Sequence, residues 1–131
     1  MRSALLLALC ACTAQKTPPP GTAGPAEAVR EFSEALRKGD TATAWSLLSE
    51  RTRAEANRLA AAARAVSDAG PENGQQMLFT SALPGRPVDV TLVSVSGDSA
   101  EVQTTEDGGP ARVWRVVREG GRWRVDLDLG R

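Results

Sequence analysis

Residues 111–129 read ARVWRVVREGGRWRVDLDL, and this stretch decides the fold of the chain. Two runs rich in Val, Trp and Arg flank the pair Gly120-Gly121, a pattern typical of antiparallel strands joined by a two-residue turn. The register set by this turn gives one apolar face and pairs opposite charges on the other, so a shift by one residue would lose both. The predicted pairs are Val116–Val125, Trp114–Leu127 and Arg118–Trp123 on the apolar face and Arg115–Asp126 on the other.

The preceding residues repeat this pattern around Gly97-Asp98. Here the turn places Val95 opposite Ala100 and Val93 opposite Val102, again on one face. Because both hairpins are rich in β-branched residues and agree on one buried face, we predict a four-stranded antiparallel sheet. The predicted strands span residues 87–96, 99–105, 111–119 and 122–129.

Upstream of the sheet, apolar residues recur at helical spacing. Val29, Phe32 and Leu36 follow Pro25 and precede Gly39, which places a helix between a favourable start and a natural stop. Residues 71–86 carry conflicting patterns and can form a loop or one helical turn. The predicted helices span residues 26–38, residues 41–49 after the N-cap candidate Asp40, and a third segment from the capping box Thr52–Glu55 to about Gly70-Pro71. Helices followed by a sheet predict an α+β domain with the helices on one side of the sheet.

The charge of the chain is balanced, with 16 basic and 16 acidic side chains, and it contains no His and no Tyr. Balanced charge without a basic block is not typical of nucleic-acid binding, so we expect no nucleic-acid partner. Without His and Tyr, common acids, bases and metal ligands are missing, so we predict no enzyme activity, no metal and no cofactor. Asp89, Asp126 and Asp128 remain the candidate bases, although the register favours Asp126 as a partner of Arg115 on an exposed face. The arginines of the last two strands are expected to form a solvated face: Arg112, Arg115, Arg118, Arg122 and Arg124.

The first residues have the layout of a cleaved export signal. Arg2 is followed by an apolar run over residues 4–9, which is too short to span a membrane. The rival interpretation is a buried N-terminal helix of the domain. Three prolines at positions 18–20 would separate such a helix from the rest of the chain, which favours the export signal.

The segment Leu9-Cys10-Ala11-Cys12 resembles the bacterial lipobox. This resemblance implies that Cys12 is lipidated and becomes the first residue of the mature chain; Cys10 fits less well, because the residue before it is the bulky Leu9. It places the protein in the bacterial cell envelope, anchored to a membrane, and Thr13 in place of Asp implies the periplasmic face of the outer membrane. The predicted division is residues 1–11 as signal peptide, residues 12–24 as lipidated cysteine and Pro-rich tether, and residues 25–131 as the domain.

Four short segments of this domain resemble the nuclear-transport-factor-2-like (NTF2-like) superfamily. They are PAEAVREF at 25–32, Gly39-Asp40 before Ala44-Trp45, GDSAEV at 97–102 and EGGRWRV at 119–125. The likeness is to small lipoproteins and secreted domains of unknown function, of the SnoaL-like type. It implies a cone in which N-terminal helices pack on a curved four-stranded antiparallel sheet. Since this fold hosts enzymes, transport factors and binding modules, it leaves the function open.

We expect a non-catalytic binding or protein-interaction module. Its partner would be an envelope protein or a second copy of the chain, docked on the outer sheet face or the edge strand. One alternative is a carrier of a small apolar ligand or lipid in the cone cavity, although the same side chains are more simply a packed core. The other alternative is an isomerase- or cyclase-type enzyme. The candidate cavity residues are Phe32, Trp45, Trp114, Val116 and Val125.

Overall fold

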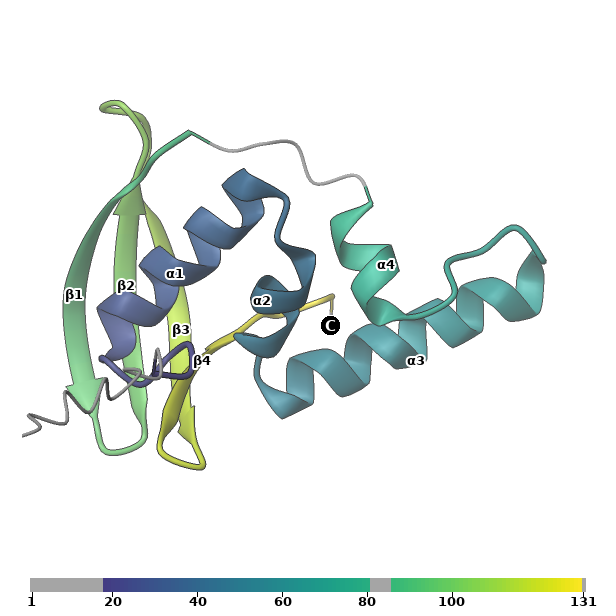
Figure 1. Ribbon diagram of the computed structural model, residues 1–131, viewed down its shortest axis with the longest axis horizontal. Helices are drawn as coiled ribbons and strands as arrows, with labels where there is room; N and C mark the ends of the chain where they lie inside the picture. Colours follow the sequence, from purple (N-terminus) through teal and green to yellow (C-terminus); the bar gives the residue numbers. More distant parts are fainter. Residues whose placement is uncertain (1–17, 81–85, 131) are drawn as a thin grey trace, which may run out of the picture.

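The computed structural model describes residues 18–80 and 86–130, in which helices are followed by strands (Figure 1). The helices are α1 (Pro25–Lys38), α2 (Thr41–Ser46), α3 (Glu50–Val66) and α4 (Gly74–Phe79). The strands are β1 (Asp89–Ser96), β2 (Ser99–Thr105), β3 (Arg112–Glu119) and β4 (Arg122–Asp126). The α+β class predicted from the sequence is confirmed.

The four strands form one antiparallel sheet in the order β1-β2-β3-β4. The register of the last hairpin is as predicted, with Val116 opposite Val125 and Arg115 opposite Asp126, and Arg118 faces Trp123. Strand β4 ends at Asp126, so the predicted pair of Trp114 with Leu127 lies beyond the ladder. In the first hairpin Val95 lies opposite Ala100 as predicted.

One predicted strand pair is wrong. Leu92, not Val93, lies opposite Val102, because the register of β1 shifts between Leu92 and Ser94. An extra residue in one strand is a β-bulge, which bends the strand and increases its twist. The bulge therefore falls in the middle of β1, at Val93.

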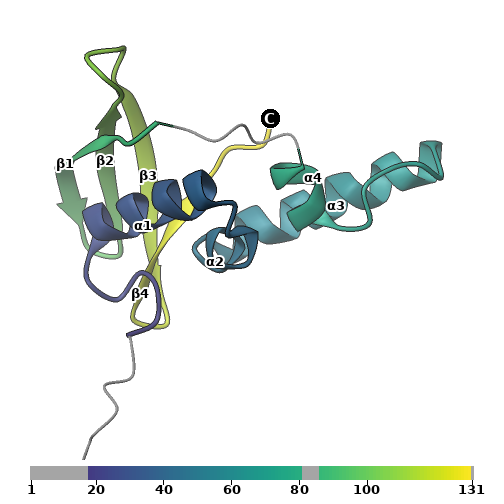
Figure 2. The same ribbon diagram turned by 45° about the horizontal axis from the view of Figure 1, so that its top comes forward.

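Helix α1 lies across the sheet and supplies the main layer of the core (Figures 1 and 2). Its buried side chains are Ala28, Val29, Phe32 and Ala35, and they pack with buried residues of the strands. Burial of one large apolar side chain stabilises a fold by about 1.5–3 kcal/mol, so Val29 and Phe32 account for most of what this helix adds to the core. The strand side of the core consists of Ala100, Val102, Val116, Trp123 and Val125.

The edge of β4 is closed by two other segments of the chain. Leu48 forms a parallel bridge with Val125, whose N–H donates to the Leu47 carbonyl at 2.6 Å. The Trp123 N–H donates to the Gly21 carbonyl at 2.8 Å. The helix predicted over residues 41–49 therefore stops at Ser46, because the next residues pair with the sheet.

Helices α3 and α4 pack against each other and project away from the sheet (Figures 1 and 2). Helix α3 begins at Glu50, where the Ser49 side chain accepts from the Thr52 N–H, so the predicted capping box at Thr52 is placed too late. Residues 71–80 include a short helix, one of the two forms expected for this region. The expectation that all helices cover one side of the sheet is wrong, since α3 and α4 form a separate arm.

Candidate functional site

Three of the five residues proposed to line a cavity are packed core. Phe32, Val116 and Val125 are buried in the main apolar cluster, while Trp45 and Trp114 are partly buried against it. The rings of Phe32 and Trp114 meet edge to face, with centroids 6.0 Å apart. The predicted lipid site, Cys12, lies outside the residues that the structure describes.

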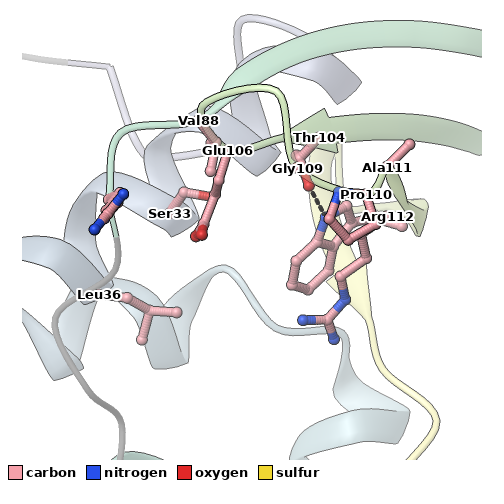
Figure 3. Close-up of a pocket in the computed structure, with 11 residues that line it drawn as sticks. Ser33, Leu36, Val88, Thr104, Glu106, Gly109, Pro110, Ala111 and Arg112 are labelled. Carbon is pink, nitrogen blue, oxygen red and sulfur yellow. Dashed lines mark hydrogen bonds between the residues drawn. The ribbon is translucent and has the colours of Figure 1, made fainter.

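A pocket of about 540 Å³ opens beside Trp114 (Figure 3). Of the five proposed cavity residues, only Trp114 lines it. Ser33 and Leu36 of α1 form one side, and Thr104 and Arg112 of the β2–β3 hairpin form the opposite side. The remaining lining residues are Arg86, Val88, Glu106, Gly109, Pro110 and Ala111.

The walls of this pocket combine a flat apolar surface with charge. The Arg112 guanidinium lies 3.9 Å from the centroid of the Trp114 ring, a cation–π arrangement. The Trp114 indole N–H donates to Thr104 Oγ at 2.8 Å, which fixes the plane of the ring. Arg86 adds a second cation and is itself paired with Asp107 at 3.2 Å. An amphipathic molecule with an apolar part and a negative group matches this chemistry.

A second polar site joins α3 to the sheet around Asp126, whose side chain is only 6% exposed. Its carboxylate accepts from Ser49 Oγ at 2.6 Å and from two nitrogens of Arg51 at 3.2 and 3.0 Å. Arg115, its predicted partner, is 3.8 Å away. The predicted ion pair is present, but the expected exposed setting of Asp126 is wrong because the start of α3 covers it.

These contacts set the charge state of Asp126. Burial raises the pKa of the Asp126 carboxyl, but hydrogen bonds from Arg51 and Ser49 and the charges of Arg51 and Arg115 outweigh it, so the pKa lies below its ordinary value. A general base poised for work near neutral pH needs the opposite shift. The network therefore favours a structural role for Asp126.

The arginines of β4 are not the solvated face expected from the sequence. The Arg124 side chain is 15% exposed, and burial, followed by the nearby charges of Arg122 and Arg53, lowers its pKa. Within residues 18–80 and 86–130, Arg53 Nε, Arg122 Nη2 and Arg124 Nε are buried without a hydrogen-bond partner. Glu119 Oε1 lies 3.7 Å from Arg124 Nε and partly balances this charge.

The clearest open surface is the edge of β1. In the described part of the chain, no strand or loop forms backbone pairs with its outer edge. Leu92, Val93 and Val95 are 45%, 51% and 52% exposed, and they make up most of the large apolar side chains exposed in the described residues. Sequence reasoning expected Val93 and Val95 to be buried; Val95 does lie opposite the buried Ala100, but its own side chain is exposed.

No helix within residues 18–80 and 86–130 has the length and apolar character needed to cross a bilayer. No group of three or more His, Cys, Asp or Glu side chains is placed there to hold a metal ion. No protein-family model, curated protein or solved structure matches the chain.

Proposed function

We propose that this chain is a non-catalytic protein-interaction module, held at the membrane of the bacterial envelope by a lipid on Cys12. The observation that carries the proposal is the unpaired, apolar edge of β1. The NTF2-like cone implied by the sequence motifs is compatible with this proposal, since pure binding modules occur among such domains.

An open strand edge presents a row of backbone N–H and C=O groups that another extended chain can pair with. Proteins usually protect such edges with Lys, Pro or a covering segment. Residues 89–96, DVTLVSVS, contain neither Lys nor Pro, and their only charge is Asp89 at one end. The bulge at Val93 is the one protective device present. The edge is therefore suited to docking by another strand.

The proposed anchor would hold the domain close to the bilayer. Gly21 is hydrogen-bonded to β4, so only the eight residues 13–20 lie between Cys12 and the folded domain. The nine residue-to-residue steps from Cys12 to Gly21 reach about 30 Å when fully extended. A domain restricted to this distance would meet partners that are themselves part of the envelope.

In-cell photo-crosslinking would test the interaction. A photoreactive amino acid at Leu92, on the β1 edge, is expected to give a protein adduct in intact cells. The matched control is Val113, which is 58% exposed but lies on the interior strand β3. Absence of any adduct at Leu92, or equal adducts at Leu92 and Val113, would contradict the proposal.

The anchor needs its own test. Radioactive palmitate should label the wild-type chain and not the Cys12→Ala variant, and the variant should leave the membrane fraction. Cys10→Ala should keep both the label and the membrane fraction. Label retained on Cys12→Ala would overturn the lipid site.

A second candidate function is a carrier of a small amphipathic ligand, supported by the pocket beside Trp114. Thermal unfolding in the presence of medium-chain fatty acids would test it, with the corresponding alcohols as uncharged controls. We expect acids to raise the melting temperature more than alcohols, and Arg112→Ala to remove the difference. No shift with either series would argue for an unoccupied surface depression.

A further inference from the structure

We propose that Arg53, Arg122 and Arg124 form a binding site for a phosphate group, at the point where the predicted tether meets the sheet. Arg122 and Arg124 belong to β4, and Arg53 belongs to the first turn of α3. The residues just before α1 lie beside the start of β4 (Figure 1). The site is separate from the β1 edge and from the pocket beside Trp114, so it goes beyond the proposed function.

Backbone carbonyls hold two of these side chains in place. Arg122 Nε donates to the Pro20 carbonyl at 2.7 Å, and Arg124 Nη1 donates to the Ser46 carbonyl at 2.9 Å. Pro20 and Ser46 directly precede the two residues whose carbonyls pair with β4. Both guanidinium groups are therefore held at this edge of the sheet, which lowers the entropy lost when a ligand binds.

The same three arginines carry donors that the fold does not use. In the described residues 18–80 and 86–130, the buried side-chain atoms without a hydrogen-bond partner are Arg53 Nε, Arg122 Nη2 and Arg124 Nε. Most buried polar groups in proteins are paired, because an unpaired donor lowers stability. Three such donors in one cluster are suited to an acceptor from outside the chain.

The charges of the cluster favour an anion as this acceptor. Burial, followed by the charges of Arg122 and Arg53, lowers the pKa of Arg124, although the carboxylates of Glu119 and Glu50 act in the opposite direction. Glu119 Oε1 lies 3.7 Å from Arg124 Nε and accepts instead from the Glu50 N–H at 3.0 Å. The two acidic side chains therefore leave the positive charge of the cluster only partly balanced.

A phosphate group matches these donors better than a carboxylate or a water molecule. Its oxygens are arranged tetrahedrally, so they can accept from guanidinium groups on several sides through charge-assisted hydrogen bonds. A carboxylate offers two oxygens in one plane, and water brings no negative charge. The Arg124 side chain is 15% exposed, so solvent reaches the cluster.

The position of the site favours a phospholipid headgroup as the source of the phosphate. Only the seven residues 13–19 lie between Cys12 and Pro20, whose carbonyl contacts Arg122. A lipid on Cys12 would keep the cluster within about 30 Å of the membrane surface. This source rests on the proposed anchor, whereas the phosphate site does not. Free phosphate has the same chemistry, so the experiment separates the two sources.

Arginine Nε–H signals in NMR spectra of the ¹⁵N-labelled full chain, purified in a non-ionic detergent, test the site directly. The added solutes are inorganic phosphate, glycerophosphoglycerol as a phospholipid headgroup without acyl chains, and chloride at matched ionic strength. Inorganic phosphate or the headgroup should shift the Nε–H signals of Arg53 and Arg124 and raise the melting temperature. Chloride should do neither.

Arg53→Gln is the variant that separates binding from a structural role. We expect its affinity for phosphate to fall about tenfold or more, since a hydrogen bond to a charged group is lost. Without phosphate its melting temperature should equal or exceed that of wild type, because one of three like charges is removed and Arg53 Nε has no partner to lose. A structural role would lower it. Arg58→Gln is the matched control on α3, at an arginine whose side chain is 64% exposed, and should keep the wild-type affinity.

The outcomes distinguish the site from its source. Tighter or equal binding of glycerophosphoglycerol relative to inorganic phosphate supports a headgroup site, and a response to inorganic phosphate alone supports a site for the free ion. Identical responses to phosphate and chloride, or equal phosphate affinity in wild type and Arg53→Gln, would overturn the site. The wild-type spectra decide the question even if the variant does not fold. None of these results depends on Leu92 or Cys12, so failure here leaves the interaction module and the anchor standing.

Discussion

Ser49 Oγ donates a 2.6 Å hydrogen bond to Asp126 Oδ1, across 77 positions of sequence. The same Ser49 side chain caps α3 by accepting from the Thr52 N–H at 3.1 Å. One hydroxyl therefore ties the start of the α3–α4 arm to the last strand of the sheet. Arg51 reinforces the joint with its two nitrogens on the same carboxylate.

Asp126→Ala is expected to destabilise the fold by about 2 kcal/mol, since it removes several hydrogen bonds to a charged acceptor and leaves Ser49 and Thr52 without it. Urea unfolding followed by circular dichroism measures this loss. Asp98→Ala is the matched control: its ion pair with Arg118 is 2.7 Å long but exposed, so the expected loss is below about 1 kcal/mol. Equal losses in the two variants would contradict the assigned role of Asp126.

The lowered pKa of Asp126 predicts acid sensitivity. In the unfolded chain an Asp titrates near pH 3.9, and in the folded chain Asp126 titrates lower, so folding favours the ionised form. The contribution of Asp126 to stability is complete when the pH is above its pKa in the unfolded chain. It is lost as the pH falls through the lower pKa of the folded chain. Unfolding free energies measured from pH 6 down to pH 2 should fall less steeply in Asp126→Asn than in wild type.

A salt series separates Asp126 from the exposed carboxylates. Glu34 and Asp40 also have a lowered pKa, caused by a hydrogen bond from Arg37 and hydrogen bonds from Thr43 respectively, but both lie in solvent. Salt screens exposed charges more than buried ones. In wild type, some decrease of the unfolding free energy with falling pH should therefore remain at 1 M salt, and this decrease should be absent in Asp126→Asn. If the same decrease remains in the variant, it is caused by another group.

Sequence reasoning succeeded where local chemistry decides the structure. The Gly120-Gly121 turn and the alternation of Val with Arg fixed one register, and Val116 does lie opposite Val125. Gly39 likewise ended the first helix as expected, since the chain leaves α1 there. In each case the determining residues lie within a few positions of one another.

Sequence reasoning failed where segments that are distant in the chain come into contact. The burial of Asp126 depends on Leu47 and Ser49 pairing with β4, and nothing within residues 41–49 marks them as strand-like. The bulge at Val93 also has no local sequence signal, since Val93 is an ordinary strand residue and no Gly lies next to it. One extra residue there was enough to make the predicted pairing with Val102 wrong.

The candidate site was predictable only in part. Trp114 was named in advance and does line the pocket, but Ser33 and Leu36 reach the pocket from α1, which lies far from Trp114 in the sequence. The open edge of β1 follows from strand order, which the sequence implied. Its exposed valines were assigned to the interior because the register of the Gly97-Asp98 turn placed Val95 opposite Ala100 and Val93 opposite Val102.

Gly21→Ala should detach the segment before α1 from the sheet. A Cβ at Gly21, where φ is +87°, would overlap the Trp123 carbonyl oxygen. Gly97 is the matched control, because its φ of +58° is also positive but nothing lies within 4 Å of a Cβ there. We expect Gly97→Ala to lose about 1–2 kcal/mol from backbone strain alone and Gly21→Ala to lose clearly more. Faster hydrogen exchange at the Trp123 amide in Gly21→Ala, but not in Gly97→Ala, would show that the hydrogen bond to Gly21 is lost. Equal losses of unfolding free energy in the two variants would contradict this prediction.

The hydrogen bond from the Trp114 indole N–H to Thr104 predicts a non-additive pair of substitutions. Thr104 is 5% exposed, and its hydroxyl is the partner of this N–H. Thr104→Val conserves volume but leaves the N–H unpaired, which should cost about 1–2 kcal/mol. Trp114→Phe should cost more, because the smaller ring also weakens the contacts with Phe32 and with the Arg112 guanidinium.

The double variant separates these contributions. Once Trp114→Phe has removed the N–H, Thr104→Val no longer orphans a donor, so its added cost should fall towards zero. Urea unfolding of the four proteins gives this coupling energy directly. Thr105→Val is the control, because Thr105 is the next residue and lies on the other face of β2. It should change the unfolding free energy by the same small amount in wild type and in Trp114→Phe. Strict additivity for Thr104 and Trp114 would mean that the 2.8 Å contact contributes nothing to stability, and that the ring beside the pocket is held by packing alone.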